Sequence, residues 1–352
     1  MNRNFFRAAV MSLVLCPLMR PQTPDSAVTI RSISAAREDL ISTVWGKPGF
    51  PLKALPEATI LKPSQPEWTR AMNEMGLAGF RGLKTVEKLD FRLPAGNSSV
   101  GYLWIARGGL NRLVILHQGH SCKFDFESEG LQAVVKALLT SGYSVATLYM
   151  PLPSPCSDGA IIPFHNKLFA EFPSSLPGSA LQLFVDPAAE TVNYGLQQLK
   201  FARVDMVGLS GGGWTTTLYA ALDPRIGLSF PVAGTRPRSV PGACGLNSGD
   251  REQDAIPSYL NLYVLGSTGA GRKQTQVLNK FDSCCFQVIC PREGRPPLNL
   301  EQDIRGYEEA TRAADAKFGG GNFSVYIDED SHAHQISSQV VEKVILHALG
   351  SP

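Results

Sequence analysis

A serine between small residues stands at the junction of a strand-like and a helix-like segment. Residues 204–207 read VDMV, and the next five read GLSGG with Ser210 at the centre. A sharp turn here would lift the serine hydroxyl clear of the sheet, and glycines at 208 and 212 would let strand and helix pass closely. The helix expected at residues 214–222 would aim its amide end at the same place, which favours developing negative charge. The pattern predicts that Ser210 is a nucleophile for a carbonyl carbon.

The segments around this turn indicate a parallel sheet. Two alternating segments, residues 86–93 and 100–106, flank a turn and predict an antiparallel hairpin. Continuous apolar runs, typical of strands covered on both faces, then alternate with helical periods. The further strands are expected at residues 113–116, 144–149, 204–207, 228–232, 260–265 and 323–327, and the helices at 130–141, 180–200, 214–222 and 338–349. This order predicts an α/β fold with a mostly parallel central sheet, an N-terminal antiparallel hairpin and helices on both faces.

These features resemble the α/β-hydrolase superfamily, in its serine hydrolase and esterase form, over residues 84–350. The resemblance rests on the G-x-S-x-G turn in its strand–turn–helix setting. It implies an oxyanion hole built partly by the loop after an earlier buried strand. Here that loop reads His117-Gln118-Gly119-His120. Gly119 and His120 would supply one backbone donor and Gly211 the other. The alternative is that His117 and His120 only cap the strand end.

The resemblance also implies a triad in the chain order serine, acid, histidine. Its histidine should lie between the last strand and the closing helix, where His332 and His334 both occur. His334 is nearer to the helix and is followed by Gln-Ile-Ser, as in the superfamily. We therefore favour His334 as the general base and expect His332 to be a structural hydrogen-bonding residue.

The acid departs from the superfamily pattern. It should follow the strand expected at residues 260–265, but residues 266–273 contain no carboxylate. Asp282 is the next one along the chain and is our choice for orienting the imidazole and stabilising its cation. Asp254 and Asp250, after the preceding strand, are the alternatives.

Other chemistries have weaker support. A metal site that joins His117 and His120 to His332 and His334 has no supporting carboxylate spacing. Residues 266–273 read GSTGAGRK, but a phosphate-binding loop needs lysine directly after the second glycine and then Ser or Thr. We therefore expect no metal, no cofactor and no NTPase activity.

The first twenty residues are typical of an export signal. Arg3 and Arg7 precede an apolar run at residues 8–18 that is too short to span a bilayer, which needs about 20 residues. Six cysteines remain after Cys16 is removed with the signal, and an even number in an exported chain suggests disulfide bonds. They are Cys122, Cys156, Cys244, Cys284, Cys285 and Cys290. We expect the adjacent pair at 284 and 285 to bond elsewhere rather than to each other.

Composition and proline content suggest the organisation of the chain. Its 33 basic and 31 acidic residues give a net charge of only +2, which offers no concentrated basic face for nucleic acid. We divide it into a signal peptide at residues 1–20, a proline-rich lead-in at 21–83 with a short helix near 68–75, and a hydrolase domain at 84–352. Residues 151–179, which contain six prolines, are expected to form a lid or pocket wall.

The sequence therefore predicts a serine hydrolase that cleaves carboxylic esters through an acyl-enzyme on Ser210. Its partner would be a small-molecule acyl ester, and it would be secreted or periplasmic without stable membrane insertion. The alternatives are a serine peptidase or amidase of the same fold, and a non-catalytic binding module on a hydrolase scaffold. The acyl group and the oligomeric state have no signal in the sequence.

Overall fold

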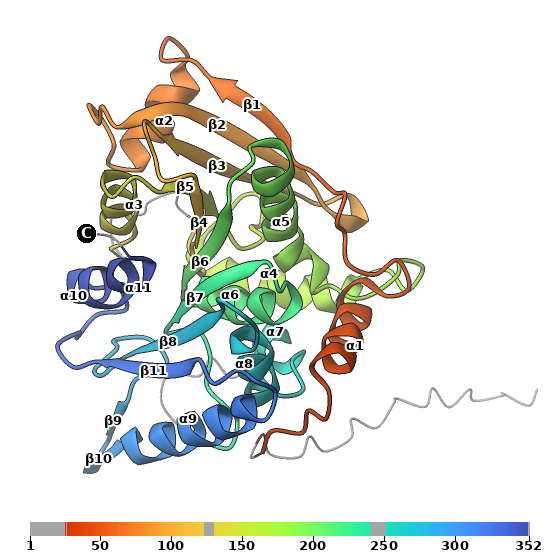
Figure 1. Cartoon of the computed structure of the whole chain (residues 1–352), viewed down its shortest axis with the longest axis vertical. Coiled ribbons are helices and arrows are strands. Elements are labelled where there is room, and N and C mark those ends of the chain that lie inside the picture. The colour runs from red at the N-terminus through yellow and green to blue at the C-terminus, as the bar shows by residue number, and fades with distance from the viewer. Residues whose placement is uncertain (1–24, 26, 123–129, 241–250, 351–352) are drawn as a thin grey trace, which may run out of the picture.

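A nine-stranded sheet forms the centre of the protein, seen in a computed structural model that describes residues 25, 27–122, 130–240 and 251–350 (Figure 1). The strand order is β1-β2-β3-β5-β4-β6-β7-β8-β11. The strands are β1 (Glu57–Leu61), β2 (Leu83–Arg92), β3 (Ser98–Ala106), β4 (Arg112–His117), β5 (Ser144–Leu148), β6 (Arg203–Leu209), β7 (Ile226–Val232), β8 (Lys273–Asn279) and β11 (Phe323–Asp328). The pairs β1–β2, β2–β3 and β3–β5 are antiparallel, and all later pairs are parallel. The predicted α/β fold with an antiparallel start is confirmed.

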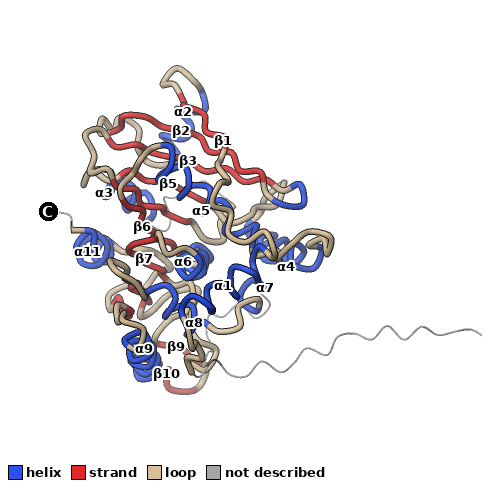
Figure 2. Tube along the Cα trace, turned by 45° about the vertical axis from the view of Figure 1, so that its right-hand side comes forward, coloured by secondary structure: helices blue, strands red, loops and turns tan. Residues whose placement is uncertain are grey.

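Helices cover both faces of this sheet (Figure 2) and enclose two apolar cores. One core is covered by α1 (Ile33–Trp45), α5 (Gln182–Asn193), α6 (Gly211–Leu222), α8 (Tyr259–Ser267) and α9 (Glu301–Ala316). The other is covered by α2 (Pro66–Glu74), α3 (Leu131–Thr140), α10 (Ser338–Val340) and α11 (His347–Leu349). Two short helices, α4 (Ile161–Glu171) and α7 (Arg251–Asp254), contact each other, and β9 (Ile289–Arg292) pairs with β10 (Arg295–Asn299). The turn that contains Ser210 lies at the start of α6.

One expected strand is a helix. Residues 260–265 lie in α8, which begins after Ser258, whose hydroxyl accepts a hydrogen bond from the amide of Asn261. The helix is buried almost all round, so its sequence lacks the polar stripe that distinguishes a helix from a buried strand. The strand at this position in the sheet is β8. Its buried Gln274 and Gln276 make hydrogen bonds to other polar groups inside the protein. Because of these polar residues, the segment lacks the apolar run from which a buried strand is predicted.

The N-terminal part of the described chain holds more regular structure than its prolines indicated. α2 matches the short helix expected near residues 68–75, but α1 and β1 were not expected. β1 pairs with β2 and forms one edge of the sheet. No helix among the described residues has the length and apolar character needed to cross a membrane. The expected signal peptide, residues 1–20, lies outside the described residues.

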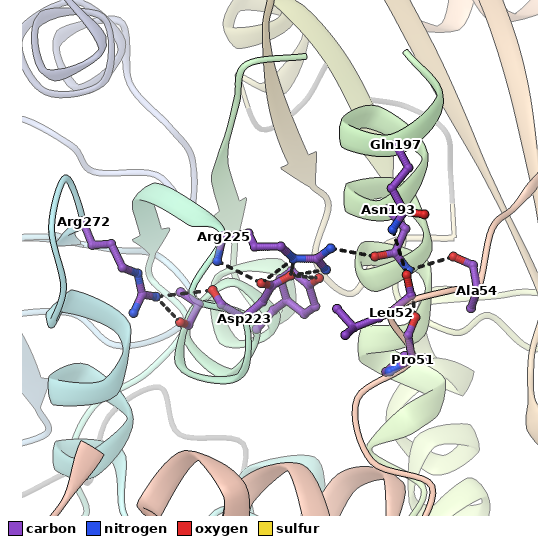
Figure 3. Close-up of polar contacts among 10 residues, drawn as sticks. Pro51, Leu52, Ala54, Asn193, Gln197, Asp223, Arg225 and Arg272 are labelled. Carbon is purple, nitrogen blue, oxygen red and sulfur yellow. Dashed lines mark hydrogen bonds and ion pairs between the residues drawn. The ribbon is translucent and has the colours of Figure 1, made fainter. Parts of the chain in front are cut away.

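Hydrogen bonds from α5 and from the π-helix that follows it, η3 (Tyr194–Gln198), hold the segment between α1 and β1 against the core (Figure 3). The amide nitrogen of the Asn193 side chain donates to the carbonyl oxygens of Pro51 and Ala54, at 2.8 Å each. Gln197 donates to the carbonyl of Leu52 at 2.8 Å. Arg225 in turn donates to the Asn193 side-chain oxygen at 2.8 Å. The lead-in is therefore attached through its backbone, which the sequence of that segment alone could not indicate.

Arg272, from the segment that resembles a phosphate-binding loop, ties helices together instead (Figure 3). Its guanidinium donates to the carbonyls of Leu265 at 2.8 Å and Thr268 at 2.9 Å, at the end of α8. It also donates to the carbonyls of Ala220 and Asp223 at the end of α6, and Figure 3 shows Asp223 beside Arg272. Burial lowers the pKa of this arginine to about 10, which leaves it charged at neutral pH. Its role is to satisfy backbone acceptors that would otherwise be buried without donors.

We expect Arg272→Met to lower the free energy of unfolding by about 3 kcal/mol, because several buried carbonyls lose a charged donor. Urea denaturation of the variant and the wild type measures the difference. Arg292→Met makes the same change at an exposed position in β9 and should leave the unfolding midpoint unchanged. Equal midpoints for the two variants would contradict the role assigned to Arg272.

Candidate active site

Ser210 lies on a strained turn at the carboxyl end of β6. Its backbone has φ 57° and ψ −124°, and α6 begins at the next residue. A positive φ is costly for a residue with a Cβ and persists only where the surroundings enforce it. The amide of Ser210 donates to the carbonyl of Val232 on β7 at 2.9 Å, and the serine itself is partly exposed. This is the strand–turn–helix setting that the sequence predicted for the nucleophile.

The glycines around the serine are required by close backbone contacts. A Cβ placed on Gly208 would lie 2.1 Å from the carbonyl oxygen of Gly212. One placed on Gly212 would lie 2.1 Å from the carbonyl oxygen of His117, at the end of β4. Gly119 approaches from the other side, because its Cβ would lie 2.6 Å from the Cβ of Ser210. The predicted oxyanion loop and the turn are therefore in contact.

Asp282 and His334 form a hydrogen-bonded pair. The Nδ1 atom of His334 lies 3.0 Å from each carboxylate oxygen of Asp282. The Asp282 side chain is fully buried and also accepts from the amides of Cys284 at 2.7 Å and Cys285 at 3.0 Å, and from the Asn279 side chain at 3.1 Å. An ionised carboxylate only accepts, so Nδ1 of His334 carries the proton and Nε2 is left as the basic nitrogen.

These groups lie at one edge of the sheet. Ser210 follows β6, Asp282 follows β8 and His334 follows β11, while Gly119 follows β4. The four strands are parallel, so their carboxyl ends meet at the same edge, where open α/β sheets bind ligands. Asp282 lies shortly after a strand, as the resemblance requires of the acid, because the strand is β8, which ends at Asn279.

The alternative residues occupy other environments. His332 is exposed, and its ring stacks on Phe281 with centroids 4.5 Å apart. Asp254 is exposed at the end of α7, and Asp250 lies outside the described residues. His117 is buried in β4, where burial lowers its pKa to about 4 and its Nδ1 lies 2.7 Å from the carbonyl oxygen of Gln118. Within the described ranges, the side chains of His332, Asp254 and His117 make no hydrogen bond to the His334–Asp282 pair.

A cluster missed by the sequence analysis lies beside the turn. Glu252 on α7 binds His120 through one carboxylate oxygen and His165 on α4 through the other, each at 2.6 Å. The three residues come from segments far apart in the chain, so no motif spacing could have indicated them. The only earlier signal was the position of His120 in the loop after β4.

The cysteines next to Asp282 correct an expectation. Cys284 and Cys285 are bonded to each other, whereas the sequence analysis expected each to bond elsewhere. Their sulfur atoms lie within 4.8 Å of a ring nitrogen of His334. A second disulfide joins Cys122 to Cys156 and so links the loop after β4 to the segment after β5. One disulfide therefore lies next to Asp282, and another joins two loops near the candidate site.

We expect a thiol reductant to lower kcat several-fold by opening the Cys284–Cys285 ring, because the amides of both residues hold the Asp282 carboxylate. Turnover is measured before and after reduction, with free thiols counted by mass spectrometry. The Cys122→Ala/Cys156→Ala variant separates this effect from reduction of the Cys122–Cys156 disulfide and should stay sensitive to reductant. A Cys284→Ser/Cys285→Ser variant with the wild-type kcat would contradict the expectation.

Comparison with known proteins supports the fold. No family model matches the chain, and no curated protein matches it in sequence. Among solved structures, Methylesterase BT1017 superposes with a TM-score of 0.57 at 15% identity, over 88% of this chain and 61% of that one. A cold-adapted esterase from an Arctic intertidal metagenomic library has a TM-score of 0.49 at 16% identity, over 75% and 92%. The Pyrococcus furiosus esterase Pf2001 has a TM-score of 0.46 at 10% identity, over 84% and 96%.

The protein has the α/β-hydrolase fold. The strand order, the serine turn and the similarity to the methylesterase structure agree on this assignment. The chain spans about three fifths of the methylesterase's length, since 61% of that protein is covered.

Proposed function

We propose that the protein is a serine hydrolase that cleaves carboxylic esters through an acyl-enzyme on Ser210. The observation that carries the proposal is the bond between buried Asp282 and Nδ1 of His334, at the sheet edge where Ser210 sits on its strained turn. This bond leaves Nε2 of His334 available to take the serine proton. A binding module needs no base held in a fixed orientation, so this pair favours a catalytic function over binding alone.

The reaction would proceed by acyl transfer to water. His334 removes the Ser210 proton as the oxygen attacks the ester carbonyl. The oxyanion is bound by the amide of Gly211 and by a backbone donor of the Gly119–His120 loop. His334 then protonates the departing alcohol and later activates the water that releases the acid. No cofactor is required.

The substrate in this proposal is a small acyl ester, and residues 151–179 form a wall or lid over the site. This segment lies between β5 and α5 and contains α4, whose His165 contacts Glu252. The methylesterase found by structural comparison makes methyl esters a natural first choice among substrates. A panel with acetyl, butyryl and longer acyl groups would then define the acyl side.

The proposed location is outside the cytoplasm, either secreted or periplasmic. Residues 1–20 would be the signal peptide, and the Cys122–Cys156 and Cys284–Cys285 disulfides suit an oxidising compartment, where such bonds persist. The mature protein would then begin with the segment before α1.

A fluorophosphonate probe combined with a substrate panel tests the proposal. We expect the probe to label Ser210, identified by peptide mass spectrometry, and short-chain esters to be hydrolysed. Faster cleavage of aminoacyl amides than of esters would instead identify a peptidase or amidase. A folded protein that neither reacts with the probe nor hydrolyses any ester would be a non-catalytic member of the fold.

A further inference from the structure

A second group of titratable side chains, distinct from Ser210, His334 and Asp282, adjoins the serine turn. Nε2 of His120 lies 2.6 Å from Oε1 of Glu252, and Nδ1 of His165 lies 2.6 Å from Oε2. The side chains of Glu252 and His165 are each 1% exposed, and that of His120 is 15% exposed. One buried carboxylate therefore bridges two imidazoles from different segments.

The acceptors determine where the protons of this cluster lie. Burial raises the pKa of Glu252, but hydrogen bonds from His120 and His165 outweigh it and bring the pKa down to about 2, so the carboxylate is ionised and only accepts. Nε2 of His165 faces the carbonyl oxygen of Pro151 at 2.8 Å, which also only accepts. Each ring nitrogen of His165 therefore faces an oxygen acceptor, which holds the ring from both sides.

His120 connects this buried hydrogen-bonded cluster to the serine turn. A Cβ on Gly211 would lie 2.8 Å from Cε1 and 3.0 Å from Nδ1 of His120, so the ring packs directly on the Gly211 backbone. The residue before it, Gly119, is in similarly close contact with Ser210. The position of the His120 ring thus sets the spacing between the two backbone segments that would bind the oxyanion.

We propose that Glu252 is a positioning residue that, through its hydrogen bond to His120, holds the Gly119–His120 loop against Gly211 in the geometry needed for oxyanion binding. His165 binds the other carboxylate oxygen of Glu252 and so ties α4 to the same point. The inference rests on the proposed function. Its physical basis is that oxyanion donors accelerate acyl transfer most when they are fixed in place before the charge develops.

The distances favour protons over a metal ion at this cluster. Tetrahedral zinc with nitrogen and oxygen ligands at about 2.0–2.1 Å separates those ligand atoms by about 3.3 Å. The nitrogen–oxygen distances here are 2.6 Å, and each carboxylate oxygen faces a different imidazole. This is the arrangement of two charge-assisted hydrogen bonds.

Glu252→Gln tests the proposal, because it keeps the shape of the side chain but removes its charge. We expect kcat and the rate of fluorophosphonate labelling to fall together by about 100-fold, the typical cost of a slight misplacement of reacting groups. KM should change much less, because substrate contacts are retained. Glu171→Gln, the same change at an exposed position on α4, should leave all three unchanged. A Glu252→Gln variant that loses only thermal stability and is labelled at the wild-type rate would overturn the proposal.

A double-mutant cycle tests whether Glu252 acts through His120 and keeps the proposal testable if Glu252→Gln folds poorly. His120→Ala should lower kcat about as much as Glu252→Gln, and the double variant should be no slower than either, since one interaction is lost. His120→Gln, whose amide can still donate to Glu252, should recover much of the loss. Multiplicative effects in the double variant, or no recovery with glutamine, would overturn the proposal.

Two further measurements separate possible failures. The first is the zinc content of the purified protein. If the wild type holds stoichiometric zinc and Glu252→Gln holds none, the cluster is a metal site and the proposal is overturned. An active, labelled wild type that is unaffected by Glu252→Gln refutes only the role of Glu252. A wild type that is neither labelled nor active refutes the proposed function itself.

Discussion

Replacing Ser210 by alanine is expected to lower kcat for ester hydrolysis by about 10⁶-fold, the loss typical of a serine hydrolase without its nucleophile. The physical reason is that the covalent route disappears, while the oxyanion donors and the substrate contacts remain. KM should therefore change little, and the fluorophosphonate probe should leave the variant unlabelled. Steady-state kinetics on a short-chain ester and labelling followed by mass spectrometry measure both effects.

The control for this prediction is Ser98→Ala, the same change at an exposed position at the start of β3. It should keep the wild-type kcat and should be labelled normally. Circular dichroism of Ser210→Ala should match the wild type. Hydrolysis by Ser210→Ala at more than about a hundredth of the wild-type rate would mean that another group carries the reaction.

His334→Ala is expected to cause a loss of similar size, about 10⁶-fold in kcat, because a triad acts as a unit. Without an imidazole held by Asp282, the serine proton has no acceptor. His332→Ala serves as the matched control, since it removes a histidine two positions away whose ring is exposed and stacked on Phe281. It should keep most of the activity.

The two histidine variants should be compared on the same substrate and with the same probe. The result that would reverse the assignment is near-total loss in His332→Ala with an active His334→Ala. Equal, modest losses in both would indicate that neither ring is the base.

The sequence predicted the structure well at positions where the backbone geometry allows only one type of residue. The turn around Ser210 needs glycines because a Cβ at 208 or 212 would meet backbone atoms at 2.1 Å, and this need is visible as a motif. Both histidines lie between β11 and α10, and the choice of His334 over His332 depended on its position nearer to the helix and on the Gln-Ile-Ser that follows it. Local sterics and connectivity are therefore readable from sequence.

Other features depended on contacts that no local pattern records. α8 resembled a strand because it is apolar on nearly every side, and β8 was missed because polar side chains such as Gln276 are buried in it. The bridge between His120, Glu252 and His165 joins three distant segments, and each residue alone looks ordinary. Pairings of this kind arise from the tertiary arrangement and become visible only when the segments are placed in space.

The close packing around Ser210 limits how this protein can diversify. Adding a methyl group at Gly213 would bring it 2.6 Å from the carbonyl oxygen of Val232, and at Gly234 it would come 2.4 Å from the amide nitrogen of Trp214. Random mutagenesis of these positions should yield almost only inactive variants, while the exposed parts of residues 151–179 should accept many changes. New substrate preferences, in nature or in directed evolution, would then accumulate in the segments above the sheet edge and leave the turn unaltered.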